Sequence, residues 1–81
     1  PFNPTTEIRF SVPEASSVRL TVYNILGQKI KVLVNDVIGQ GNHTVVWDGS
    51  DNDGKQVSSG IYFYRMQGEN FAAVKKMIFA K

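Results

Sequence analysis

Three aspartates lie close together in the polar segment after Trp47, and their spacing suggests a metal site. They are Asp48, Asp51 and Asp53. Acidic oxygens at short spacing before Gly54 resemble half of a calcium-binding loop. Against the full EF-hand pattern, however, Gly49 falls at the first ligand position and Gly60 at that of the bidentate Glu. We therefore expect a polar turn in which Asp48 caps backbone amides, with weak calcium binding as the alternative.

The remaining reactive residue types are scattered and form no catalytic pattern. His43 is the single histidine, and the sequence has no cysteine for a zinc site or a disulfide. The serines lie in turn-like contexts without the G-x-S-x-G pattern of a nucleophile elbow. The carboxylates form no convincing acid–base pair. We expect no enzyme activity and no cofactor.

Trp47 has two possible roles. Its ring could stack on a sugar at the surface, or it could anchor the core while its N–H group donates to a backbone carbonyl. Trp47 shares a strand face with Val45, and this shared face favours the core. Replacement by alanine would then cost roughly 3–5 kcal/mol.

The segments that position these residues alternate between apolar and polar side chains, which indicates β-strands. The six expected strands cover residues 5–12, 18–23, 29–34, 43–48, 60–67 and 71–80. Residues 35–42 are expected to form a loop. No long window has helical spacing, so we predict an all-β sandwich of six or seven short antiparallel strands.

Two positions predict local geometry. Asn24 can hydrogen-bond to the backbone two residues on, and Gly27 can adopt the left-handed conformation that closes a hairpin. Leu33 breaks the alternation of the third strand, which predicts a bulge or exposure at an edge.

The last two strands leave their buried faces less certain. In strand 60–67 both faces are apolar until Arg65, and we favour the face that avoids this charge. Its inward residues would be Tyr62, Tyr64 and Met66. In strand 71–80 the lysines fall on both faces, so periodicity does not identify the buried one.

Length and composition limit the classes of function. The 81 residues form one domain, 1–81, with an extended lead-in over 1–4. The net charge of +2 is too small to indicate a nucleic-acid partner, and no apolar run is long enough to span a membrane. Because the chain starts at Pro1 without an initiator Met, we interpret it as the C-terminal module of a longer protein, monomeric in isolation.

Five segments in order resemble the type A C-terminal sorting domain of the type IX secretion system. They are PFNPTTEIRFSVP (1–13), VRLTVYNILGQKI (18–30), GNHTVVWDG (41–49), SSGIYFYR (58–65) and the Lys-rich end KKMIFAK (75–81). The residues that carry this signature are Asn24, Gly27, Trp47, Asp48, Gly49, Gly60 and Tyr62. The same WDG and GxY pattern also resembles the Ig-like domain of flagellar hook-capping proteins. The lead-in and the terminal lysines favour the sorting interpretation.

The sorting resemblance implies an Ig-like β-sandwich without catalytic activity, attached behind a cargo domain in the same chain. It also implies an outer-membrane secretion machinery as protein partner and a secreted or cell-surface location reached through the periplasm. The residues expected to contact the translocon, if the last strand is an edge, are Lys75, Lys76, Met77, Phe79 and Lys81. The alternatives are that these residues only complete a sheet, that the domain is a hook-capping module, or that it is an accessory module for carbohydrate binding or surface adhesion.

Overall fold

The computed structural model describes residues 5–80, so the expected lead-in over 1–4 and the terminal Lys81 lie outside the described residues. The six strands are β1 (Thr6–Val12), β2 (Ser16–Asn24), β3 (Lys29–Ile38), β4 (Gly41–Trp47), β5 (Gly60–Gln67) and β6 (Ala72–Phe79). All pairings between them are antiparallel. The predicted all-β sandwich is confirmed.

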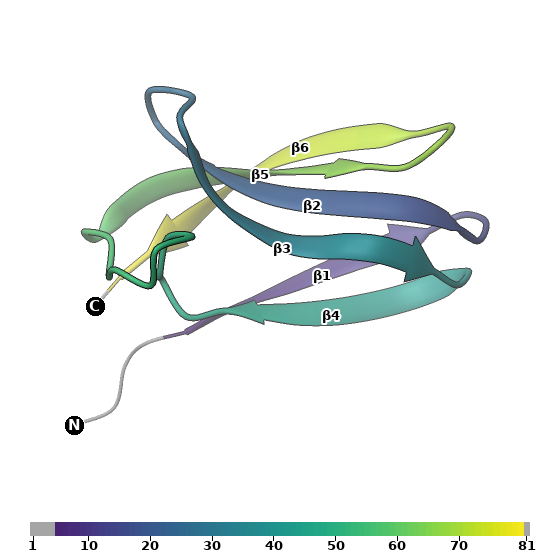
Figure 1. The fold of residues 1–81 in the computed structure, drawn as a ribbon, viewed down its shortest axis with the longest axis horizontal. Coiled ribbons are helices and arrows are strands. Elements are labelled where there is room, and N and C mark those ends of the chain that lie inside the picture. The colour runs from purple at the N-terminus through teal and green to yellow at the C-terminus, as the bar shows by residue number, and fades with distance from the viewer. Residues whose placement is uncertain (1–4, 81) are drawn as a thin grey trace.

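The strands form two sheets of unequal width. One sheet has the order β3-β2-β5-β6, and the other contains β1 and β4. Figure 1 shows the wider sheet as the upper layer and the pair β1–β4 as the lower one. The chain passes between the sheets after β1, β3 and β4, so each sheet combines strands that are distant in sequence.

The core lies between the two layers and is made by alternate residues of the strands. On β2 these residues are almost completely buried, because β2 lies between two neighbouring strands of its own sheet and the other sheet packs against its inner face. The core residues are Ile8, Phe10, Val12, Val18, Leu20, Val22, Trp47, Tyr62, Met66 and Phe79. On β5, Tyr62 and Met66 are buried and Tyr64 packs against the core as a half-buried residue, so the predicted inward face is confirmed.

The bulge predicted at Leu33 is also present. Leu20 pairs with Val34 and Thr21 with Val32, so Leu33 has no partner on β2. A second irregularity skips Ile30 in the same way. Both skipped residues are half-buried and pack against the core, because each extra residue turns the strand and changes which side chain faces inward.

The predicted loop over 35–42 is wrong, because β3 continues to Ile38 and β4 already begins at Gly41. Asn35 and Asp36 have low strand propensity, yet they pair with Arg19 and Val18 of β2. They lie on an edge strand, where their side chains remain in water while the ladder pairs their backbone. Tertiary pairing therefore overrides local preference here.

Candidate functional site

The polar segment after β4 is anchored by Trp47. This ring is completely buried, and its Nε1–H donates to the Ser50 carbonyl over 2.9 Å. Its centroid lies 5.1 Å from the Tyr62 ring and 5.0 Å from the Phe79 ring. The predicted core role is confirmed, and a buried ring cannot stack on a sugar, so the carbohydrate-binding interpretation of Trp47 is wrong.

Trp47, Tyr62 and Phe79 form an aromatic cluster, and Gly49 allows its rings to pack closely. Its φ of +78° is left-handed, and a Cβ built there would lie 2.1 Å from Cζ of Phe79. The Phe79 ring therefore occupies the space that any other side chain would need. Tyr62 completes the arrangement by donating its hydroxyl to the Ser58 carbonyl over 2.6 Å.

Two of the three aspartates of this segment, Asp48 and Asp51, serve as turn caps. Asp48 Oδ1 accepts from the Ser50 amide over 3.0 Å and also from the Ser50 hydroxyl. Asp51 Oδ1 accepts from the amides of Asp53 and Lys55, both over 2.9 Å. The predicted capping by Asp48 is observed, and Asp51 repeats it. Within residues 5–80, no group of three or more His, Asp or Glu side chains could hold a metal ion.

The electrostatics around Asp48 match this capping role. Hydrogen bonds from the Ser50 hydroxyl and the Ser50 amide, with the charge of Lys31 nearby, hold the pKa of Asp48 below its ordinary value. Lys31 Nζ also donates to the Ser50 hydroxyl over 3.2 Å. The ionised carboxylate therefore orders the start of the segment.

The hairpin between β2 and β3 projects two aliphatic side chains into water. Ile25 is 70% exposed and Leu26 is 79% exposed. The turn beneath them is tightly built: Asn24 Oδ1 accepts from the amides of Leu26 (3.0 Å) and Gln28 (2.9 Å), and Gly27 has the predicted left-handed φ of +81°. We call Ile25 and Leu26 the hairpin tip.

Sequence reasoning identified the turn but missed its tip. The signal was present, since aliphatic residues at the two central positions of a turn have no strand face to occupy. Their conspicuous exposure on a rigid turn makes the tip a candidate protein contact.

The residues expected to contact a translocon do not form one surface. Phe79 is buried in the aromatic cluster, and Met77 is half-buried against the core, so neither is free to meet a receptor. Lys75 and Lys76 are exposed on opposite faces of β6, because successive residues of a strand alternate. β6 is an edge strand, as supposed. Lys81 lies outside the described residues.

His43 has a structural environment. Its Nε2 lies 2.7 Å from the Gly39 carbonyl, and its ring stacks on Phe10 with centroids 5.5 Å apart. The ring therefore supports the connection between β3 and β4. No helix within residues 5–80 is long and apolar enough to cross a membrane.

Comparison with known proteins bears on which of the two related families applies. A family model described as the FlgD Ig-like domain matches residues 2–71. The crystal structure of FlgD from P. aeruginosa superposes with a TM-score of 0.76 at 22% sequence identity, over 93% of this chain. The chain spans 58% of the length of that structure. No curated protein matches this sequence.

These findings contradict the type IX sorting interpretation, because the matching model is that of the hook-capping relative. The reason is physical: the shared WDG and GxY motifs consist of packing residues. Trp47, Gly49 and Tyr62 build the aromatic cluster, so they report the fold and not the route by which a protein is exported. The expected secretion machinery and cell-surface location rested on the same resemblance.

The family match covers most of the chain and includes the anchored Trp47, the capped turns and the hairpin that bears the tip. The chain belongs to the FlgD Ig-like domain family.

Proposed function

We propose that this domain is a non-catalytic assembly module of a flagellar hook-capping protein. The observation that carries the proposal is the match of residues 2–71 to the FlgD Ig-like domain. The likeness to P. aeruginosa FlgD adds support at the level of the fold. The polar groups near Trp47 agree with it, since the carboxylates of Asp48 and Asp51 accept backbone hydrogen bonds that hold the turns in place.

The hairpin tip is the part of the surface best suited to contact another subunit. When a partner covers exposed aliphatic side chains, the complex is stabilised by about 25 cal/mol per Å² of apolar area removed from water. The hydrogen bonds of Asn24 fix the backbone of the turn that carries Ile25 and Leu26 before a partner binds. Little backbone conformational entropy is therefore lost on binding. We expect the tip to insert into an apolar site on a neighbouring subunit.

The test replaces Ile25 and Leu26 together by serine in the parent protein, in the bacterium that encodes it. Val37 is 71% exposed on β3, so Val37→Ser is a control of equal exposure at another place. We expect few assembled hooks in electron micrographs of the tip variant and normal hooks in the control. Equal hook numbers in the two strains would show that the tip does not contribute to hook assembly. Normal hooks after deletion of residues 5–80 would refute the proposed function itself.

A further inference from the structure

The two sheets differ in width: among residues 5–80 the wider sheet has four strands and the smaller sheet has two. β4 approaches β3, so the pair β1–β4 covers the side of the sandwich formed by β3 and β2. Val18, Leu20 and Val22 of β2 are accordingly at most 1% exposed. On β5 and β6 the inward residues near Trp47, Tyr62 and Phe79, are also buried. Further along the same face, Tyr64 and Ala73 are only half-buried and Lys75 is exposed.

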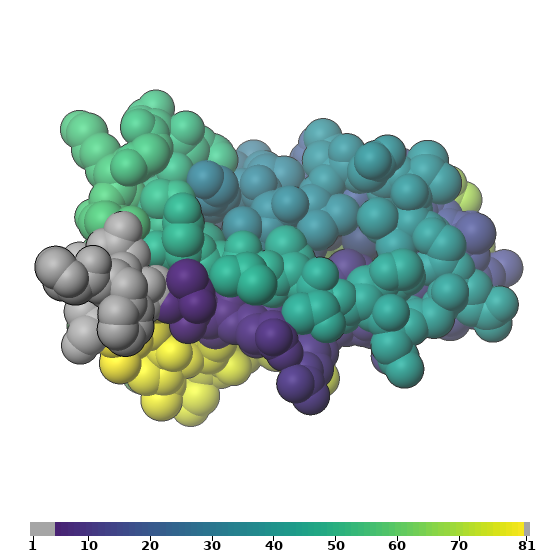
Figure 2. All heavy atoms as spheres, turned by 90° about the horizontal axis from the view of Figure 1, so that it is seen from below, coloured from purple at the N-terminus to yellow at the C-terminus, as the bar shows by residue number. Residues whose placement is uncertain are grey.

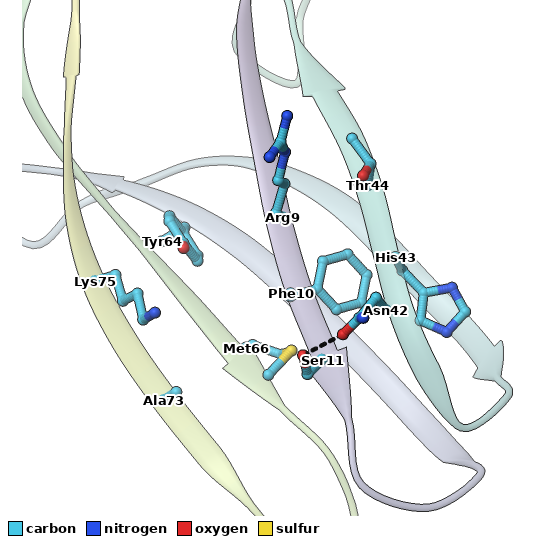
Figure 3. A pocket seen from close by; sticks show the side chains of 10 residues that line it. All are labelled: Arg9, Phe10, Ser11, Asn42, His43, Thr44, Tyr64, Met66, Ala73 and Lys75. Atoms are coloured by element: carbon cyan, nitrogen blue, oxygen red, sulfur yellow. Dashed lines mark hydrogen bonds between the residues drawn. The ribbon is translucent and has the colours of Figure 1, made fainter.

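A pocket of about 600 Å³ lies beside these less buried residues. It is bounded by β1 and β4 on one side and by β5 and β6 on the other. Figure 3 shows Tyr64, Met66 and Lys75 on the side of the pocket opposite Phe10. Seen from the β1–β4 side, β1 lies between β4 and β6 (Figure 2). The smaller sheet of a constant-type Ig sandwich has three strands, whereas the smaller sheet here has two within residues 5–80.

The edge of β1 that borders the pocket is available for pairing. Among the described strands β1 pairs with β4 alone. In an antiparallel pair, every second residue directs its N–H and C=O groups away from the partner strand. These unpaired groups form a template for one more strand.

The charge of the pocket favours an acidic occupant. Arg9 and Lys75 line it, and no Asp or Glu does. Glu7, which is next to the pocket on β1, forms an ion pair of 2.8 Å with Arg9. The Lys75 side chain forms no ion pair or hydrogen bond with any residue in 5–80, so its ammonium group is free to meet a carboxylate.

We propose that the groove between β1 and β6 binds an extended segment of a partner protein by strand addition to β1. The segment becomes the third strand of the smaller sheet, and its inward apolar side chains pack on Tyr64, Met66 and Ala73. An acidic side chain of the segment pairs with Lys75. A second copy of this chain is a poorer occupant, because it would bring a second Arg9 and Lys75 into the same groove. The proposal does not depend on the hook-capping function.

The test tethers a strand to the end of the chain through a Gly/Ser linker. A linker of about 20 residues spans about 25 Å, which is comparable to the length of β1, about 23 Å for seven residues. The tethered strand has seven residues with Val at alternate positions. In a series of variants, each Val in turn is replaced by Glu. A matched series carries Lys in place of Glu. Tethering supplies an effective concentration in the millimolar range.

Amide hydrogen exchange of β1 is the readout. We expect at least one Glu-bearing strand to slow exchange of the unpaired β1 amides by about tenfold or more, as when nine molecules in ten are paired. The Lys-bearing strands should protect less. Lys75→Glu should reverse this preference, whereas Lys76→Glu, on the opposite face of β6, should leave it unchanged.

Three results would overturn the proposal. One is unchanged exchange of β1 with every tethered strand. Another is protection confined to β6, which would place the added strand on the other edge. The third is a dimer of the untethered chain, seen by analytical ultracentrifugation, whose β1 amides are already protected. That dimer would identify a second copy as the occupant.

Discussion

Replacing Gly49 by alanine tests the packing of the aromatic cluster against the Asp-capped turn. Two costs combine at this position. A non-glycine residue at the left-handed φ of +78° costs about 1–2 kcal/mol, and forcing a methyl group against a packed ring costs about 1–3 kcal/mol. Because Cζ of Phe79 lies 2.1 Å from the position of the new Cβ, both costs apply. We expect a loss of about 2–5 kcal/mol in the free energy of unfolding.

Gly27→Ala is the matched control for this substitution. Gly27 has nearly the same φ, +81°, but nothing lies within 4 Å of a Cβ built there. Its alanine variant should therefore lose only the conformational part. Urea unfolding gives both free energies by linear extrapolation. In a Phe79→Leu background the Gly49→Ala loss should fall toward that of Gly27→Ala, and equal losses of the two single variants in the native background would refute the reasoning.

Three further substitutions test the site. Trp47→Ala should lower the free energy of unfolding by roughly 3–5 kcal/mol, measured in urea, and a variant of unchanged stability would show that the ring is not a core anchor. Asn24→Ala should cost about 1 kcal/mol for the lost side-chain hydrogen bonds, and NMR exchange of the Leu26 amide should rise; an unchanged rate would contradict the capped turn. Asp48 has a folded-state pKa below the ordinary 3.8, so its stabilising effect is present above that value and is lost as pH falls through the folded pKa. Asp48→Asn should therefore reduce the loss of stability on acidification, seen in thermal unfolding between pH 5 and pH 2, and an unchanged acid dependence would remove the carboxylate from the account.

Much of the fold could be read from the sequence because burial has a period of two in strands. Ile8, Phe10 and Val12 alternate with polar residues, and the structure buries all three. Leu33 broke the alternation and proved to be a bulge. The end of β3 could not be read in this way, since Asp36 is held in the strand by its partner Val18 and not by its own preference.

The functional features were less predictable, for two physical reasons. The pocket beside β1 depends on which strands face each other, and no local pattern records that arrangement. The lysines of β6 illustrate the point: Lys75 and Lys76 are adjacent and alike in sequence, yet only Lys75 lines the pocket. The type IX sorting assignment is wrong because the motifs that carry it are packing motifs shared by both related families.

The most direct test of the central claim is a count of hooks in the bacterium that encodes this chain. Residues 5–80 are removed in frame from the parent protein, and a second strain carries the exposed-site control Val37→Ser. A capping role predicts that the deletion strain lacks hooks in electron micrographs while the control strain has normal ones. Normal hooks in the deletion strain, with the shortened protein present at the wild-type level, would contradict it.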